Sequence, residues 1–377
     1  MSDPVQPVPA SGGTRLRFAL DGGFHADLKR RVATYLAAQG AAGDRHEAFL
    51  TLKALGIFVA LGLTYGVLVF APVTVWQACG LALLCGVLAA LVGFNIQHDG
   101  GHKAFSRRPW RNRVAAASLD LIGASSYLWH WKHAVFHHGC ANVSGHDTDI
   151  SVGSLVRLEP HQPRLAHHRW QHVYIWALYG LMAVRWQLYD DLREVVNGAI
   201  GPHRIPRPRG WAMTWFLVGK ALFVGLVLVL PMCLHPVWAV LLLYGLASYA
   251  LGTVLALVFQ LAHNTAACDF PVPAEADGRM ERSWAEHQVA TTADFARGSR
   301  WATWLLGGLN FQVEHHLFPQ LSHLHYPALS TIVEATCRDH GVIFREHPSL
   351  WSGLLAHFRW LRTLGLAPAA TSGSAPH

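Results

Sequence analysis

The chain of 377 residues is 52% hydrophobic and only 14% charged, against about 25% charged in an average soluble domain, so it is a membrane protein or has an unusually apolar core. Its formal charge of +7 suits lipid headgroups or an acidic carrier, and nucleic acid is not expected as a partner because no basic run is interleaved with aromatic residues. The six cysteines form no CxxC pair, which argues against a disulfide framework or a zinc finger.

The two ends of the chain are predicted to be disordered. Residues 1–14 form a Pro/Gly/Ser-rich lead, and residues 366–377 form a similar tail. The N-terminus lacks the layout of a cleaved signal peptide and is expected to stay in the cytosol. Residues 24–39 have their apolar positions on one side of a helix. This helix is expected either on the membrane surface or as an ordinary helix with a soluble face.

Four long apolar runs follow the N-terminal helix, and each approaches the roughly 20 residues that cross a hydrocarbon core. They cover residues 52–71, 75–94, 212–231 and 236–259. Only a few residues around Pro72 separate the first two runs, and Pro231 and Pro236 flank the short connector between the last two. The pattern predicts two transmembrane hairpins, each entering and leaving on one side.

The distribution of Lys and Arg predicts the orientation of these hairpins. The short connectors carry none, whereas the long segments 95–211 and 260–365 carry many, so the positive-inside rule places both segments and both termini in the cytoplasm. Residues 173–186 are apolar but too short to span, and we expect an interfacial or re-entrant helix there. The predicted fold is an all-α integral membrane domain over residues 15–365, with four transmembrane helices and a helical cytosolic cap. In a bacterium it would lie in the inner membrane.

Histidines gather on the predicted cytosolic side in three clusters and one isolated position. The spacings are i, i+4 or i, i+3, which places side chains on one helix face. The residues are His98 and His102; His133, His137 and His138; His263; and Gln312, His315 and His316. Imidazole suits iron, copper, zinc and nickel. Eight histidines and an amide are too many for one ion, so the sequence predicts a site for two metals.

Two glycines stand between the first pair of histidines. Gly100 and Gly101 would each weaken a helix by about 1 kcal/mol relative to alanine. We expect them to be used for close backbone packing beside the metals.

Three segments resemble the histidine boxes of membrane fatty acid desaturases. The first box is HDGGH (98–102), the second lies in WHWKHAVFHHGCANVSGHDTDI, and the third lies in GGLNFQVEHHLFPQLSHLHYP. The Gln that opens the third box is similar to that of the front-end and linoleoyl-CoA desaturase branch. FQLAHNTAACDFP and WAEHQVATTADFA resemble linking segments of the same branch. The resemblance covers roughly residues 24–345.

This resemblance implies a di-iron centre that activates O2 and removes two hydrogens from an acyl chain. The implied ligands are the eight clustered histidines, with His263 at the isolated position of the family and Gln312 beside them. Ala134 replaces the Asn that many members carry in the second box. No HPGG motif of a fused cytochrome b5 domain occurs, so the expected electron donor is a separate protein, a ferredoxin or a cytochrome b5 with its reductase.

Each polar residue beside the boxes has two alternative roles. Asp99, Asp147 and Asp149 either hydrogen-bond the far nitrogens of ligand histidines or cap helices and loops, and Asn142 is equally open. Glu314, inside the third box, is predicted to face solvent.

Further from the ligands, His323 and His325 are expected to pack or cap. Trp129 is expected to anchor the chain at the membrane interface. Lys220, within the third apolar run, is expected to extend its ammonium group toward the interface.

The chemistry that the resemblance implies explains why metals are needed. An unactivated methylene has no acidic C–H bond, so the oxidant must come from metal–oxygen chemistry that the protein positions. The expected activity is acyl desaturation, with hydroxylation, ketolation or acetylenation on the same scaffold as alternatives. The alternative from another functional class is a membrane haem protein or a metal-transport protein. Transport predicts ionisable residues in the middle of the spans, and only Lys220 qualifies; haem predicts paired histidines there, and none occurs.

Overall fold

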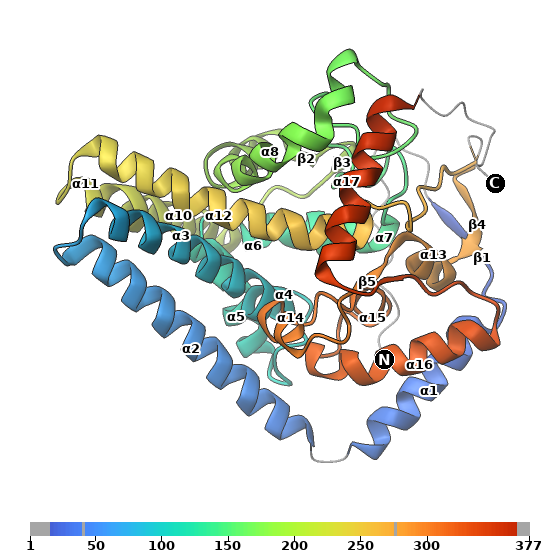
Figure 1. The fold of residues 1–377 in the computed structure, drawn as a ribbon. Helices are drawn as coiled ribbons and strands as arrows, with labels where there is room; N and C mark the ends of the chain where they lie inside the picture. Colours follow the sequence, from blue (N-terminus) through green and yellow to red (C-terminus); the bar gives the residue numbers. More distant parts are fainter. Residues whose placement is uncertain (1–15, 40–41, 275–276, 368–377) are drawn as a thin grey trace.

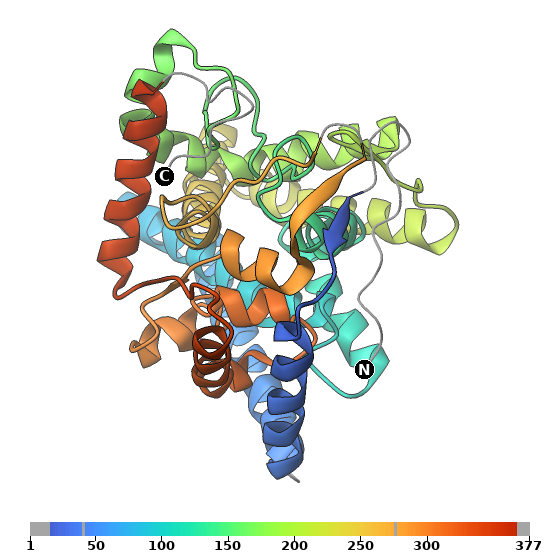
Figure 2. The same cartoon turned by 90° about the vertical axis from the view of Figure 1, so that its right-hand side faces the viewer.

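The structure is a computed structural model, and it describes residues 16–39, 42–274 and 277–367. The predicted lead 1–14 lies outside the described residues, as does nearly all of the predicted tail 366–377. The described chain is mostly helical, with three small two-stranded sheets. Long helices extend to one side of the molecule, and shorter helices gather at their other end (Figures 1 and 2).

Four helices are long and apolar enough to cross a membrane, which confirms the four predicted runs. They cover Arg45–Phe70, Val75–Gly101, Trp211–Met232 and Val237–His263. The first belongs to α2 (Ala42–Phe70). The second joins α3 (Val75–Val92), η1 (Gly93–Gln97) and α4 (His98–Gly101). The third joins α10 (Trp211–Val224), η5 (Gly225–Val229) and α11 (Leu230–Met232), and the fourth is α12 (Val237–His263).

Each hairpin turn is fixed by local chemistry. Thr74 and Gln77 form a capping box at the start of α3, in which each side chain bonds the backbone of the other residue. Pro236 directly precedes α12, where its fixed φ suits a helix start. The second and fourth spans run beyond the apolar runs, the second to Gly101 and the fourth to His263. The spans themselves therefore carry His98 and His263 to the functional end of the molecule.

The segment between the second and third spans is built of short helices. They are α5 (Pro109–Leu121), α6 (Ser126–Trp129), η2 (His130–His137), α7 (His138–Cys140), η3 (Ala166–Trp170), α8 (Gln171–Arg185), η4 (Trp186–Asp190) and α9 (Asp191–Asn197). The predicted helix over 173–186 is present as α8, and it packs along α12. The two backbones are in contact, because a Cβ on Gly252 would lie 2.6 Å from the carbonyl oxygen of Tyr179.

The segment after the fourth span covers the same end of the molecule. Its helices are α13 (Trp284–Thr291), α14 (Arg300–Leu305), α15 (Gln312–Leu317), η6 (His323–His325), α16 (Tyr326–Asp339) and α17 (Leu350–Leu366). The N-terminal helix α1 (Phe24–Ala38) packs against α16 and α13. Its apolar residues Phe24, Leu28 and Val32 are buried in that contact. Its apolar side is therefore covered by protein.

Short strands connect distant parts of this cap. β1 (Arg17–Ala19) pairs in parallel with β4 (Arg279–Ser283), β5 (Asp294–Phe295) pairs in parallel with β6 (Glu346–His347), and β2 (Ala199–Ile200) pairs antiparallel with β3 (His203–Arg204). The β5–β6 pair joins the segment that precedes the third box to the segment that precedes α17.

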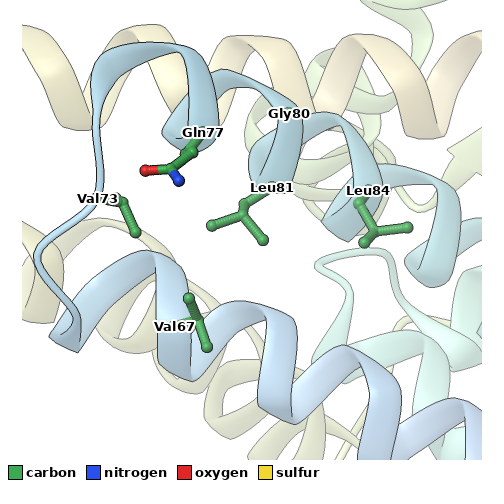
Figure 3. A pocket seen from close by; sticks show the side chains of 6 residues that line it. All are labelled: Val67, Val73, Gln77, Gly80, Leu81 and Leu84. Carbon is green, nitrogen blue, oxygen red and sulfur yellow. The ribbon is translucent and has the colours of Figure 1, made fainter.

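An apolar groove of about 400 Å³ lies between α2 and α3, near the hairpin turn (Figure 3). Its lining residues are Val67, Val73, Gln77, Gly80, Leu81 and Leu84. The groove belongs to the end of the hairpin remote from His98, so it takes no part in the histidine cluster.

Lys220 lies in the third span but does not extend toward the interface, because protein groups surround its ammonium. Nζ donates to Asp191 Oδ2 at 2.8 Å and to the carbonyl oxygen of Gly123 at 2.6 Å. The carbonyl oxygens of Trp186 and Gln187 lie at 3.3 and 3.2 Å. A charge within a span is tolerated when it is paired inside the protein, and Asp191 supplies the pair.

Replacing Lys220 with methionine is expected to destabilise the protein by about 3–5 kcal/mol, because Asp191 is left buried without its counter-charge. The double variant Lys220→Met/Asp191→Asn should recover most of this loss, since asparagine can still accept the Ser125 amide. Chemical unfolding in detergent measures the difference. Lys29→Met on α1 is the control and should stay within about 0.5 kcal/mol of the unmodified protein.

Candidate metal centre

All eight predicted histidines converge at one place from four segments of the chain. Their ligand nitrogens form three overlapping groups, within each of which the nitrogens lie within 4.8 Å of one another. The first group is His98, His102, His133 and His315; the second is His137, His263 and His316; the third is His138, His315 and His316. The third group shares one member with each of the others. The arrangement is consistent with two metal positions that have histidines between them.

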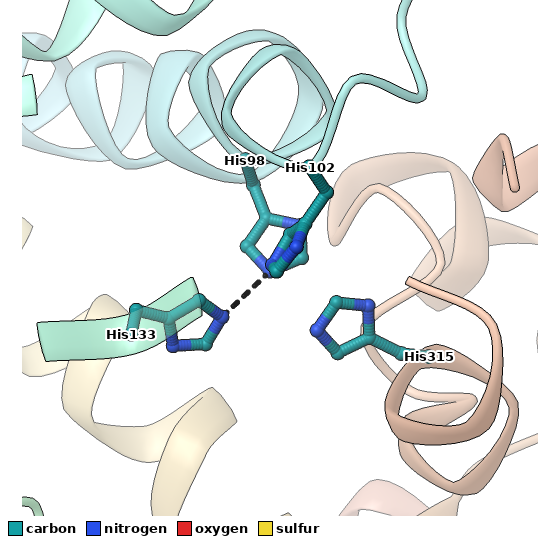
Figure 4. Close-up of side chains that lie close together, drawn as sticks. All are labelled: His98, His102, His133 and His315. Carbon is teal, nitrogen blue, oxygen red and sulfur yellow. Dashed lines mark hydrogen bonds between the residues drawn. The ribbon is translucent and has the colours of Figure 1, made fainter. Parts of the chain in front are cut away.

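In the first group the imidazoles point at a common centre (Figure 4). His98 Nε2 lies 3.2 Å from His133 Nε2, and His138 Nε2 lies 3.3 Å from the same atom. His315 enters from the third box, with its ring centroid 4.4 Å from that of His98. Three segments distant in sequence therefore bring the imidazole nitrogens of the first group within 4.8 Å of one another.

The second box is π-helical, whereas the i, i+4 spacing of its histidines had predicted an α-helix. Residues His130–His137 form the π-helix η2. A π-helix widens the turn, and such turns are frequent at functional sites. His133 and His138, five residues apart, thereby share a face, while His137 points toward the second group.

The second group forms around the end of α12. The ring centroid of His263 lies 4.7 Å from that of His137 and 4.8 Å from that of His316. Gln312 Nε2 lies 3.0 Å from His263 Nε2. The amide that opens the third box therefore lies directly beside this group.

The Nδ1 atoms of four of the clustered histidines lie close to protein oxygens. These histidines are His137, His263, His315 and His316. Asp147 Oδ2 lies 3.1 Å from His137 Nδ1, and Gln288 Oε1 lies 2.8 Å from His316 Nδ1. The Tyr326 hydroxyl and the Thr291 carbonyl oxygen lie 3.2 and 3.3 Å from Nδ1 of His315 and His263. A hydrogen bond on one ring nitrogen fixes the tautomer and leaves the other free to bind a metal.

Of these four supports, sequence reasoning anticipated only Asp147 as a candidate. Gln288 lies in the segment WAEHQVATTADFA, which had been matched to the family only as a linker. Tyr326 follows the third box in the motif HLHYP. Both residues lie in segments that resemble the family, and this resemblance could have identified them. They were missed because neither has a side chain of a type that usually binds metals.

Asn142 connects three parts of the site. Its backbone is left-handed, with φ 56, and its amide donates to the carbonyl oxygens of His263 at 2.8 Å and Thr291 at 3.3 Å. Its own backbone N–H donates to Asp147 Oδ2 at 2.9 Å. This fully buried residue thus links the second box to the end of α12 and to α13.

The other two aspartates do not support the clustered histidines in the same way. Asp99 Oδ2 lies 2.8 Å from Nδ1 of His323, which is not one of the eight. Asp149 Oδ2 lies 3.8 Å from His137 Nδ1, beyond hydrogen-bond distance. The Asp99–His323 pair connects the first box to the loop after the third box.

Glu314 was predicted to face solvent, and this prediction is wrong. Its side chain is fully buried, like every other residue of α15. Burial and the neighbouring Asp294 carboxylate raise the pKa of Glu314 well above its usual range, and burial raises the pKa of Asp294. The prediction assumed that the helix side opposite His315 faces solvent, but α15 has only six residues and other elements, α13 and α16 among them, cover all of its sides.

Burial keeps most of the clustered imidazoles neutral. Desolvation, followed by repulsion from neighbouring histidines, lowers the pKa of His102, His133 and His138 well below the usual range. The same causes lower the pKa of His315 and His316. Neutral imidazole is the form that binds metal ions. His137 differs, because its Asp147 neighbour outweighs burial and raises its pKa.

The donor set fits a metal. Among the eight clustered histidines, five buried ring nitrogens have no hydrogen-bond partner in the described structure: His102 Nε2, His137 Nε2, His138 Nδ1, His315 Nε2 and His316 Nε2. An unpaired buried polar group costs about 1–3 kcal/mol, and coordination would remove that cost. The nitrogen donors suit a first-row transition metal such as iron.

The two glycines of the first box allow close packing, as expected. A Cβ on Gly100 would lie 2.5 Å from the backbone nitrogen of Ala116 in α5, and one on Gly101 would overlap the ring of Trp129. The half-buried ring of Trp129 packs against the rings of His133 and His102, with centroids 4.7 and 5.2 Å away. Its anchoring at the membrane interface stays a prediction. The glycines let α5 and Trp129 enclose the first group.

Gly100→Ala is expected to destabilise the protein by about 1–3 kcal/mol, because the backbone of α5 cannot move aside without shifting α4. Since α4 carries His98, metal content should fall as well. Chemical unfolding and metal analysis of the purified protein measure the two effects. Gly298→Ala is the matched control, because a Cβ there meets nothing within 4 Å; equal losses in both variants would contradict the packing role.

Comparison with known proteins gives the family. Residues 74–348 match the fatty acid desaturase family model. The chain is 35% identical to the sn-1 linoleoyl-lipid 6-desaturase of Synechocystis sp., over 94% of this chain and 98% of that protein. It is 36% identical to the acyl-lipid (8-3)-desaturase of Physcomitrium patens, over 93% of this chain and 73% of that protein. With its histidines gathered as described, the chain belongs to the fatty acid desaturase family, oxidoreductases that introduce carbon–carbon double bonds into acyl chains.

Proposed function

We propose that this desaturase uses two iron ions and O2 to form a double bond in an acyl chain. The observation that carries the proposal is the convergence of eight histidines into overlapping groups with unpartnered buried nitrogens. When bound, the iron pair would supply the O2-derived oxidant that an unactivated methylene requires. O2 takes four electrons to become two waters, two from the acyl chain and two from the donor protein.

The residues divide between the two ions. His98, His102, His133 and His315 would hold one ion. His137, His263 and His316 would hold the other, with Gln312 beside them, and His138 lies between the two positions. Asp147, Gln288, Tyr326 and the Thr291 carbonyl would keep Nε2 of their partners as the metal-binding atom.

The proposed substrate is an acyl chain carried by a membrane lipid, which the names of both relatives support. The electrons would come from a separate protein, a ferredoxin or a cytochrome b5 with its reductase. The histidine site and both termini would lie on the cytoplasmic side, because the hairpin connectors carry no Lys or Arg. In a bacterium this membrane would be the inner membrane.

Mass spectrometry of acyl chains from cells that express the protein tests this function. A species lighter by two hydrogens is expected, and it should be absent from cells that express His137→Ala. His130→Ala is the matched control, because His130 is exposed and belongs to none of the three groups. A species heavier by one oxygen would instead establish hydroxylation on the same scaffold.

A further inference from the structure

The helix that runs through α8, η4 and α9 carries an exposed apolar stripe along its outer side. The stripe consists of Val173, Leu181, Leu188, Leu192 and Val196, which are 60%, 52%, 42%, 46% and 70% exposed. The spacings of four, seven and eight residues repeat the period of a helix. The stripe extends well beyond residues 173–186, for which the sequence predicted an interfacial or re-entrant helix.

The charged residues of this helix are sorted between its two sides. Its three carboxylates, Asp190, Asp191 and Glu194, are all buried. Asp191 pairs with Lys220 at 2.8 Å, and Glu194 pairs with Lys132 at 2.9 Å. These pairs fix which side of the helix faces the protein. The outer side keeps the apolar stripe and is free of carboxylates.

Basic and aromatic residues lie at the margin of the stripe. Arg169 lies over the ring of Trp170, and Arg193 lies over the ring of Tyr189, each at 5.5 Å from the ring centroid. Trp170 and Tyr189 are each 57% exposed. Amphipathic aromatics and arginines beside an apolar face are typical of helices that lie in the headgroup region of a bilayer.

The packing of α8 also places it at membrane depth. Gly252, where α8 contacts α12, lies about 22 Å along the helix from Val237 at 1.5 Å per residue. Lys220, which binds the η4 segment, lies about 18 Å from Met232 on the same scale. A hydrocarbon core is about 30 Å thick. If the hairpin turns mark one surface of the core, α8 crosses the spans before they reach the other surface.

We propose that residues 171–197 form a helix embedded in the leaflet on the histidine side, with the stripe in contact with lipid acyl chains. Arg169 then lies at the level of the headgroups, where anionic lipids attract it. Arg185 and Arg193 lie at the same margin, 55% and 45% exposed, and pair with Asp190 at 2.9 and 3.6 Å. The inner side of the same helix holds Lys220 of the third span and Lys132, the neighbour of His133. A lipid-facing element thus contacts the second box directly.

Nitroxide scanning of the full-length protein in lipid nanodiscs tests the proposal. Single cysteines are introduced at Val173, Leu181, Leu192 and Val196 after the native Cys79, Cys85 and Cys233 are replaced by alanine. Power-saturation EPR then compares the accessibility of each label to O2, which partitions into lipid, and to a water-soluble nickel chelate. The stripe positions are expected to show an O2-to-nickel ratio at least about threefold higher than polar positions of the same helix.

Adjacent residues provide the controls. Arg193 follows Leu192 and Asn197 follows Val196, and all four are exposed, so each pair differs mainly in the direction of the side chain. Equal ratios within both pairs would overturn the proposal. Exclusion of both reagents together with spin–spin broadening would also overturn it, because it would show that a second copy of the chain covers the stripe. The measurement needs neither iron nor turnover, so its outcome is independent of the proposed function.

Discussion

Protein purified with His263 replaced by alanine is expected to retain about one iron ion per chain, where the proposed centre of the unmodified protein would hold two. His263 belongs only to the second group, so the first group keeps all four of its imidazoles. Desaturation should fall by more than about 100-fold, the upper end of what loss of a supporting hydrogen bond alone costs. Metal analysis and acyl-chain mass spectrometry measure the two quantities on the same preparation.

Two further variants complete this experiment. His102→Ala should remove the other ion, because His102 belongs only to the first group. His130→Ala should keep both ions and full activity, since His130 is exposed and lies outside the groups. Retention of two ions in His263→Ala would show that this histidine is not a ligand.

Asp147→Asn is expected to weaken metal binding in the second group by about 10- to 100-fold. Asp147 Oδ2 lies against His137 Nδ1 and also accepts the Asn142 backbone N–H, while Oδ1 accepts the backbone N–H of Asp149. Asparagine has the same shape but is neutral and has one acceptor oxygen, so at least one of these bonds is lost and His137 no longer faces the carboxylate of Asp147. Competition with a chelator, followed by iron absorbance, measures the change in affinity.

Asp339→Asn is the control for charge removal, because Asp339 is 53% exposed and pairs only with an arginine on α1 in the described structure. Its metal affinity should match that of the unmodified protein. If Asp147→Asn binds both ions as tightly as the control, the orientation of His137 does not depend on this carboxylate.

The four spans could be predicted because their signal is local. Length and apolar composition within each run decide whether a helix can cross a bilayer, and no distant residue is needed to read them. The spacing of His98 and His102 is equally local, since one helix turn determines which side chains are neighbours. Recognition of the third box came from a pattern of adjacent residues in the same way.

The rest of the site depends on contacts between segments far apart in the chain. Gln288 is useful only because α13 lies against α15, and Glu314 is buried because several elements, α13 and α16 among them, pack around α15. Lys220 was expected to extend toward the interface, because its partner Asp191 comes from another element and is not visible in the span itself. A helical-face argument describes one helix, whereas burial is decided by what packs around that helix. The π-helical turn of the second box was missed for a different reason, since its residues have no distinctive composition.

Both metal groups take a member from the third box, His315 for the first and His316 for the second. During synthesis these two residues leave the ribosome after all four spans have emerged. Neither ion can therefore find its full set of ligands while the chain is still being inserted into the bilayer. The proposed iron centre would therefore be loaded late in the maturation of this protein, and a chain truncated before residue 312 would be expected to reach the membrane without holding either ion.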